Sequence, residues 1–225
     1  MSGITGIFYK DSRTVQLDDV ARMTHEIQHR GQDRQDGWCH GNVGLGNALL
    51  ETTPESFFEK LPYTDEKYKL TITADARIDN RDELFDRLSL TNDNNKPDSF
   101  LLLEAYKEWG EECAQYLLGD FTFVIWDDNS QKLVCCRDYL GHRPFFYYND
   151  EKSFVFASEI KGLRALTDIP FIINDVRVAD YLQLIVDNNE YTFYQDIHRL
   201  EPATIMTITS GRIDKKKYFF FDSIQ

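Results

Sequence analysis

The first nine residues constrain the fold most, because a β-strand begins almost at the amino terminus. Residues 3–9 alternate small and apolar side chains over the length of one strand. A strand at this place ties the start of the chain into a sheet and fixes the preceding residue, Ser2. Removal of Met1 would leave an α-amine and a hydroxyl together on Ser2, a pair that can serve as base and nucleophile. Serine is also simply a common second residue.

The remaining pattern predicts one domain of mixed helices and strands. Helices are expected over residues 18–27, 81–88, 100–109, 159–166 and 175–185, with Asn80 and Asp98 as N-caps of the second and third. Strands are expected over residues 43–50 and 69–74. The second half is rich in strands and predicts three hairpins: 121–126 with 132–137, 145–148 with 153–157, and 203–209 with 212–219.

Composition narrows the class of protein. The 225 residues are 42% hydrophobic and 14% aromatic, which indicates a single globular domain spanning residues 1–225. A net charge of −13 disfavours nucleic acids and anionic membranes as partners. No apolar run is long enough to span a membrane and no secretory signal is evident, so we expect a cytoplasmic protein.

Four cysteines lack the paired spacing of a metal site. We interpret them as reduced packing residues, and expect the neighbours Cys135 and Cys136 to point to opposite faces of a strand. The sequence therefore predicts neither a metal ion nor a cofactor.

Several stretches, taken in order, resemble class II glutamine amidotransferases. Residues 1–8 (MSGITGIF) match the amino-terminal motif of that family, except that Ser2 stands where the family carries cysteine. Similar motifs follow at residues 29–33 (HRGQD), 137–145 (RDYLGHRPF) and 156–161 (FASEIK). Residues 192–202 (TFYQDIHRLEP) and 217–218 (KY) resemble the end of the glutaminase domain in asparagine synthetases, β-lactam synthetases and lasso-peptide cyclases. The resemblance extends from residue 2 to about residue 222.

This resemblance implies an α+β fold, the N-terminal-nucleophile hydrolase sandwich, in which two antiparallel sheets lie face to face between helical layers. It also implies a reaction in which a terminal thiol attacks the side-chain amide of glutamine. Ammonia then passes to a second domain, where ATP activates an acceptor carboxylate. The Ser-Gly-Gly-x-Asp-Ser loop of that second domain does not occur in this sequence. We therefore expect no synthetase domain within residues 1–225.

The family's functional positions fall on altered residues. The nucleophile position is Ser2. The two oxyanion donors, an Asn side chain and the backbone N–H of the following Gly, fall on Asp75 and Ala76, and the arginine that holds the substrate carboxylate falls on Leu49. Asp98 matches the acid that receives the substrate amine. A carboxylate at residue 75 would repel the negative charge that develops during amide hydrolysis.

We interpret the chain as a degenerate glutaminase-like domain that serves an ATP-dependent, amide-forming synthetase, either on a separate chain or downstream in a longer one. Two alternatives stay open: an active amidohydrolase that uses Ser2 on glutamine or another amide, and a module that binds a small molecule or peptide. Association into a homo-oligomer is also open.

Four further features have a structural interpretation. His29 and His142 are expected in turns, and Lys215 to Lys217 on a solvated sheet edge. The three rings of Phe219, Phe220 and Phe221 cannot all face one core, so some of them are expected to contact a partner or a further domain.

Overall fold

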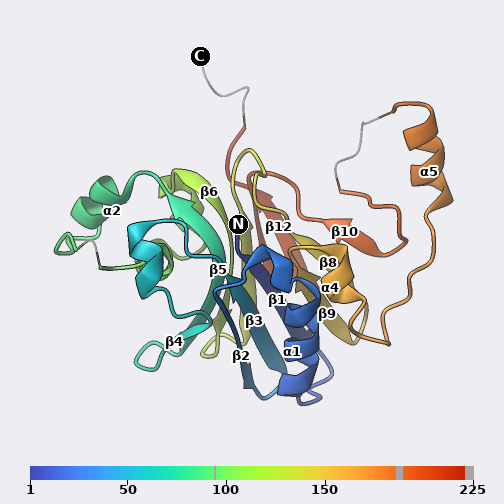
Figure 1. The fold of residues 1–225 in the computed structure, drawn as a ribbon, viewed down its shortest axis with the longest axis horizontal. Helices are drawn as coiled ribbons and strands as arrows, with labels where there is room; N and C mark the ends of the chain where they lie inside the picture. The colour runs from blue at the N-terminus through green and yellow to red at the C-terminus, as the bar shows by residue number, and fades with distance from the viewer. Residues whose placement is uncertain (94, 186–189, 221–225) are drawn as a thin grey trace.

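Two six-stranded antiparallel sheets lie face to face in the computed structural model, which describes residues 1–93, 95–185 and 190–220 (Figure 1). The first sheet has the order β10-β8-β9-β1-β3-β2, and the second has the order β12-β11-β7-β6-β5-β4. β1, which opens the chain, lies inside the first sheet between β9 and β3. The residues next to Ser2 are therefore held from both sides.

The first sheet consists of β1 (Gly3–Tyr9), β2 (Arg34–His40), β3 (Val43–Leu49), β8 (Phe146–Asn149), β9 (Ser153–Ala157) and β10 (Ile197–Arg199). The second consists of β4 (Tyr63–Asp65), β5 (Leu70–Ile78), β6 (Gly119–Asp127), β7 (Lys132–Arg137), β11 (Thr204–Ile208) and β12 (Ile213–Lys217). The α-helices are α1 (Leu17–Glu26), α2 (Arg81–Arg87), α3 (Asp98–Trp109), α4 (Ile160–Leu163) and α5 (Asp175–Leu182). Short 3₁₀ helices cover Gln28–Arg30 (η1), Pro54–Phe58 (η2) and Gly110–Tyr116 (η3).

Three apolar clusters fill the spaces between the layers. The central cluster joins the two sheets and includes Phe8 of β1 and Trp126 of β6, whose ring centroids are 5.5 Å apart. A second cluster packs α2 and α3 on the outer face of the β5-β6-β7 sheet. The third packs α1 and α4 on the outer face of the other sheet. The layers thus run helix, sheet, sheet, helix, which confirms the predicted α+β sandwich.

Alternation along β5 decides which of its side chains face the candidate site. Leu70, Ile72 and Ala74 pack in the second cluster, on the side of α2 and α3. Because successive strand residues point to opposite faces, Thr73 and Asp75 face the other sheet. The Thr73 hydroxyl donates to the backbone carbonyl of Gly46 in β3 at 3.1 Å. The strand therefore directs the Asp75 side chain toward the sheet that holds Ser2.

The predicted hairpins are confirmed, with each of the first two in a different sheet. β6 pairs with β7 in the second sheet, β8 with β9 in the first, and β11 with β12 at the edge of the second. The cysteines of β7 also follow the prediction, since Cys135 lies in the central cluster and Cys136 lies in the second cluster, on the side of α2 and α3. All four cysteines are within the described residues and are free thiols.

Five details of the prediction were wrong or incomplete. β5 continues to Ile78, beyond the predicted end at residue 74. β2, β4 and β10 were not predicted at all. All three lie at sheet edges, where short length or solvent exposure removes the alternating apolar pattern. The helix predicted over residues 159–166 is a single turn at 160–163.

Of the two predicted N-caps, Asn80 occupies the N-cap position but makes no side-chain capping hydrogen bond, and Asp98 does not occupy that position. α3 begins at Asp98 itself, after Pro97, and the Asp98 carboxylate contacts other elements. Asn80 does precede α2, but its side chain donates to the carbonyl of Tyr116 at 3.0 Å and accepts from the N–H of Leu118 at 2.9 Å. Both side chains connect segments that are distant in the sequence, an interaction that local capping rules cannot anticipate.

The carboxyl-terminal predictions are met in part. Lys215 to Lys217 lie on the edge strand β12, as expected. Phe219 packs against the ring of Tyr139 at 5.6 Å, whereas Phe220 is exposed. Phe221 lies outside the described residues.

Candidate active site

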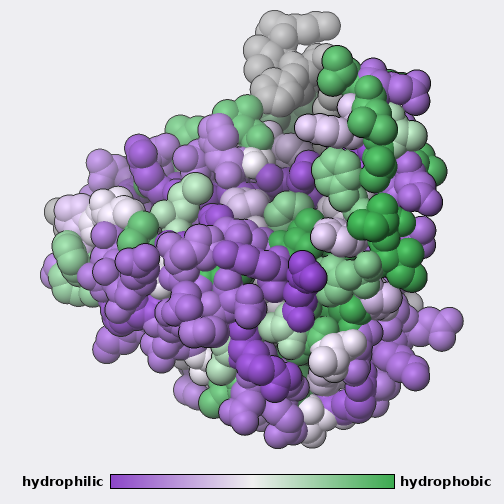
Figure 2. Space-filling model, turned by 45° about the vertical axis from the view of Figure 1, so that its right-hand side comes forward, coloured by the Kyte–Doolittle hydropathy of each residue, from purple (hydrophilic) through white to green (hydrophobic). Residues whose placement is uncertain are grey.

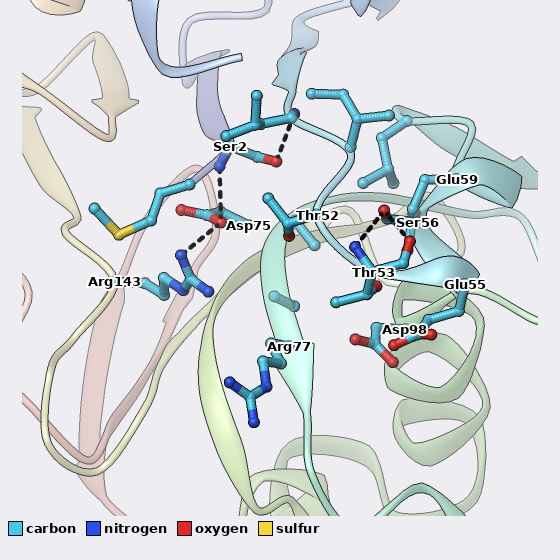
Figure 3. Close-up of a pocket in the computed structure, with 16 residues that line it drawn as sticks. Ser2, Thr52, Thr53, Glu55, Ser56, Glu59, Asp75, Arg77, Asp98 and Arg143 are labelled. Carbon is cyan, nitrogen blue, oxygen red and sulfur yellow. Dashed lines mark hydrogen bonds and ion pairs between the residues drawn. The ribbon is translucent and has the colours of Figure 1, made fainter. Parts of the chain in front are cut away.

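A cavity of about 320 Å³ opens where the start of β1, the end of β3, β5 and the start of α3 meet (Figure 3). Its lining includes all five residues singled out from the sequence: Ser2, Leu49, Asp75, Ala76 and Asp98. Residues from four separate segments therefore converge on one cavity. Ser2 and Asp75 lie together on one side of it, and Asp98 lies on the other (Figure 3).

Ser2 is buried and held by three hydrogen bonds. Its backbone N–H donates to Asp75 Oδ1 at 3.2 Å, and its carbonyl accepts from Arg30 Nε at 3.0 Å. Its hydroxyl oxygen accepts from the backbone N–H of Leu50 at 3.0 Å. Both the nitrogen that would become the α-amine and the hydroxyl are thus fixed at the cavity wall, with a carboxylate next to the nitrogen.

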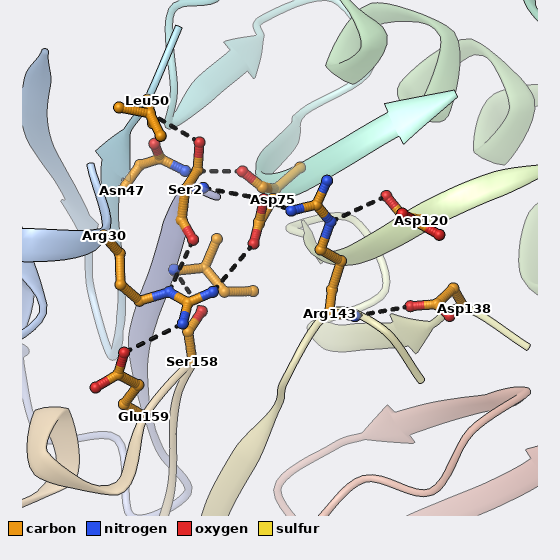
Figure 4. Close-up of polar contacts among 12 residues, drawn as sticks. Ser2, Arg30, Asn47, Leu50, Asp75, Asp120, Asp138, Arg143, Ser158 and Glu159 are labelled. Carbon is orange, nitrogen blue, oxygen red and sulfur yellow. Dashed lines mark hydrogen bonds and ion pairs between the residues drawn. The ribbon is translucent and has the colours of Figure 1, made fainter. Parts of the chain in front are cut away.

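Asp75 is only 3% exposed and lies between two arginines (Figure 4). Oδ1 is 3.4 Å from Arg143 Nη1, and Oδ2 is 3.6 Å from Arg30 Nη2. Burial raises the pKa of the Asp75 carboxyl, and the charges of Arg143 and Arg30 oppose this rise. Within the described residues, Asp75 Oδ2 and Arg30 Nη2 have no hydrogen-bond partner. Each arginine therefore contacts Asp75 through one N···O pair that is longer than a charge-assisted hydrogen bond, and neither pairing is bidentate.

Both arginines are positioned by motif residues. Glu159, at the start of α4, accepts from Arg30 Nη1 at 3.1 Å and also contacts His29 Nε2 at 3.0 Å. Asp138 accepts from the backbone N–H groups of residues 140, 142 and 143, and this fixes the turn that carries Arg143 (Figure 4). The predicted site did not include Arg30, Arg143 or Glu159, although all three lie in the motifs at 29–33, 137–145 and 156–161.

The edge of β5 still offers one backbone donor. The N–H of Ile78 donates to Asp98 Oδ2 at 3.0 Å, away from β6. Backbone N–H groups two residues apart point to the same strand edge, so the N–H of Ala76 also points away from β6. β4 pairs with β5 only as far as Ile72, so this edge is open beside the cavity. Ala76 thus presents its N–H to the cavity that Ser2 lines.

The other predicted positions differ in what they offer. Leu49, at the end of β3, is 6% exposed and presents an apolar side chain to the cavity. Asp98 is paired with Arg81 Nη1 and accepts from the N–H of Ile78, so both of its carboxylate oxygens are engaged. Burial raises the pKa of its carboxyl.

Glu59, which the sequence analysis did not single out, also lines the cavity. It is 6% exposed, and its Oε1 accepts from the N–H of Ser99 at 3.0 Å. Burial raises the pKa of Glu59 to about 7. No local pattern marks it, because it becomes buried only when α3 packs against the loop that follows β3.

The two histidines lie outside the cavity lining. His29 and His142 are both about half exposed, and His142 Nδ1 is 2.7 Å from Asp120 Oδ1. This hydrogen bond and the charge of Asp120 raise the pKa of His142.

Among the described residues, no group of three His, Cys, Asp or Glu side chains could hold a metal ion. None of the helices in residues 1–93, 95–185 and 190–220 has the length and apolar character that crossing a membrane requires.

Comparison with known proteins agrees with this architecture. Residues 1–219 match the family described as "Glutamine amidotransferase domain". The chain is 28% identical to asparagine synthetase [glutamine-hydrolyzing] 3 of Bacillus subtilis, over 99% of this chain and 37% of that protein. It is 26% identical to putative asparagine synthetase [glutamine-hydrolyzing] 2 of Methanocaldococcus jannaschii, over 99% of this chain and 47% of that protein. The chain thus spans less than half the length of these relatives.

Solved structures share the fold at low sequence identity. Glutamine phosphoribosylpyrophosphate amidotransferase from B. subtilis, complexed with ADP and GMP, superimposes with a TM-score of 0.68 at 15% identity, over 96% of this chain and 49% of that one. A glutamine aminotransferase class-II domain protein from Silicibacter pomeroyi gives a TM-score of 0.52 at 11% identity, over 96% of this chain and 98% of that one. With the family match over nearly all residues, the chain belongs to the glutamine amidotransferase domain family, as a class II domain related to asparagine synthetases.

Proposed function

We propose that this domain has lost glutaminase activity and acts as a scaffold or partner for an ATP-dependent, amide-forming synthetase. One observation carries the first half of the proposal: Asp75 Oδ1 lies 3.2 Å from the nitrogen of Ser2, inside the cavity. A carboxylate there stands where amide hydrolysis needs a hydrogen-bond donor, and the nucleophile beside it is a hydroxyl instead of a thiol.

The first effect concerns the oxyanion. Hydrolysis of an amide places negative charge on the former carbonyl oxygen, and active enzymes direct hydrogen-bond donors at it. Loss of one such donor costs about 2.7 to 4 kcal/mol in transition-state stabilisation. Asp75 both lacks the donor and, when ionised, adds repulsion. Arg30 and Arg143 offset part of that charge, and the N–H of Ala76 remains as a single donor.

The second effect concerns the nucleophile. The hydroxyl of Ser2 is a weaker nucleophile than a thiol. If Met1 is removed, the nitrogen of Ser2 becomes an α-amine beside Asp75. The carboxylate favours the protonated amine, whereas burial and the charges of Arg30 and Arg143 favour the neutral one, as they do at Met1, where burial lowers the pKa of the terminal amine. The nucleophile and the oxyanion site are therefore both weakened.

The substrate side of the cavity supports the same interpretation. Leu49 offers no donor to the carboxylate of an amino acid, and a clamp of this kind is what orients a substrate. Asp98 is already paired with Arg81. We therefore propose that Leu49, Asp75, Ala76 and Asp98 mark the former substrate and oxyanion positions, with Ser2 at the former nucleophile position.

The partner follows from the relatives. They are named glutamine-hydrolysing asparagine synthetases, and this domain corresponds to less than half of each. A domain that keeps the fold but not the reaction retains the surfaces by which it contacts the rest of such an enzyme. We propose that a synthetase domain is that contact.

Ammonia release from glutamine tests the loss of activity. The chain is purified, and intact mass first establishes that Met1 is absent and that the amine of Ser2 is free. We expect the unmodified chain and the Ser2→Ala variant to release ammonia at the same background rate. Steady release that Ser2→Ala abolishes would overturn the proposal.

A further inference from the structure

Residues 172–185 and 190–193, which we call the apolar arm, present many hydrophobic side chains to solvent. Of the 18 large hydrophobic side chains that are exposed among the described residues, nine lie in this arm. The most exposed are Val176 at 70%, Leu182 at 76% and Leu184 at 84%. Figure 1 shows α5 projecting from the sheets at the right, and Figure 2 shows hydrophobic residues gathered down the corresponding side. Scattered exposed hydrophobics are ordinary, but a contiguous group marks an interaction surface.

The helix of the arm buries none of its residues against the rest of the described chain. α5 has eight residues, and each of them is at least partly exposed. Its internal contacts are local: Asn174 caps the helix by accepting from the N–H of Arg177 at 3.2 Å, and the ring of Tyr181 packs edge-on against Phe193 at 5.4 Å. Isolated helices shorter than about 12 residues are marginal in water. A second protein surface over the arm would supply the missing burial.

The relatives indicate what covers it. Alignment with the two asparagine synthetases includes 99% of this chain, so nearly all of the arm belongs to the shared domain, while more than half of each relative is additional sequence. A second copy of this chain is a poorer occupant, because each copy carries a net charge of −13 and the two would repel. We propose that the apolar arm is the docking surface for the synthetase domain. This inference rests on the proposed function and adds the place of contact.

Site-specific photo-crosslinking tests the contact. A benzophenone amino acid replaces Leu182 or Leu184 in the full chain, expressed in its source cell. The control position is Leu118, a 48% exposed leucine between η3 and β6. We expect adducts from positions 182 and 184 in which mass spectrometry finds peptides of a synthetase domain, and none from position 118. Adducts that contain only a second copy, adducts equal at all three positions, or none at all would overturn the assignment.

A paired variant separates docking from folding. The double change Leu182→Ser, Leu184→Ser should reduce the amount of synthetase that co-purifies with the chain by at least tenfold and leave the melting temperature of the isolated chain unchanged. Leu118→Ser should change neither. If the double variant holds the synthetase as firmly as the unmodified chain, the surface is wrong although the proposed partnership stands. If no synthetase accompanies the unmodified chain, the proposed partnership itself fails, and with it this inference.

Discussion

Replacing Glu59 with glutamine should stabilise the domain at alkaline pH. Glu59 is 6% exposed, and burial raises its pKa to about 7 from an ordinary 4.5. Between these two values the folded chain keeps a proton that the unfolded chain releases, so stability falls as the pH rises through this window. The difference between these two pKa values corresponds to about 3 kcal/mol of folding free energy, and all of it is lost above pH 7.

Glutamine removes this penalty because it stays neutral and can still accept from the N–H of Ser99. At pH 8 Glu59→Gln should gain up to about 3 kcal/mol, which for a chain of this size is a rise of about 6 to 12 °C in melting temperature. At pH 5, where the carboxyl is protonated in the folded chain, the variant and the unmodified chain should melt within about 2 °C of each other.

Thermal melts followed by circular dichroism at pH 5 and pH 8 measure both effects. Glu55→Gln, in the preceding helix η2 and less buried, is the matched control and should change neither melt by a comparable amount. A Glu59→Gln variant that melts no higher than the unmodified chain at pH 8 would refute the reasoning. So would one that keeps the full pH dependence of the unmodified chain.

Three further predictions concern burial elsewhere. Arg143→Gln should lower the free energy of unfolding, measured in urea, by about 3 kcal/mol because it leaves Asp75 buried with one arginine fewer. The control is Arg77→Gln, which removes an exposed ion pair whose arginine side chain is 60% accessible and should lower the same free energy by less than about 1 kcal/mol. At pH 8 only Cys39 should react with a thiol reagent in the native chain, and slowly, because burial raises its pKa to about 11; the other three cysteines should react only after unfolding. Leu102→Ala, fully buried in α3, should destabilise the domain by about 2 to 5 kcal/mol in the same urea titration.

The sequence predicted best the strands that are buried and bounded by turn residues. β7 and β9 were predicted at their observed bounds, because both of their faces are buried and turn residues flank them. The edge strand β2 was missed, since its sequence is largely polar and exposed. A local pattern of apolar residues indicates a buried strand, and an edge strand buries few of its side chains.

The motifs predicted which residues form the candidate site, but they did not predict how those residues are arranged. Ser2, Leu49, Asp75, Ala76 and Asp98 do line one cavity.

Long-range contacts limit what sequence reasoning can supply. The pairing of Asp98 with Arg81, the burial of Glu59 and the position of Asp75 between two arginines depend on segments that meet only in the folded chain. The sequence also did not predict that α5 lies away from the sheets. The amphipathic pattern of this helix is the same whether or not a partner covers it.

Restoring the thiol is the most direct test of the central claim, that the carboxylate of Asp75 prevents glutamine hydrolysis. The measurement is glutamate formation from glutamine by the Ser2→Cys variant, with intact mass establishing that Met1 is absent. We expect Ser2→Cys alone to stay at the background rate, since the oxyanion site and the carboxylate clamp are still altered. Robust turnover by that single variant would contradict the proposed roles of Asp75 and Leu49.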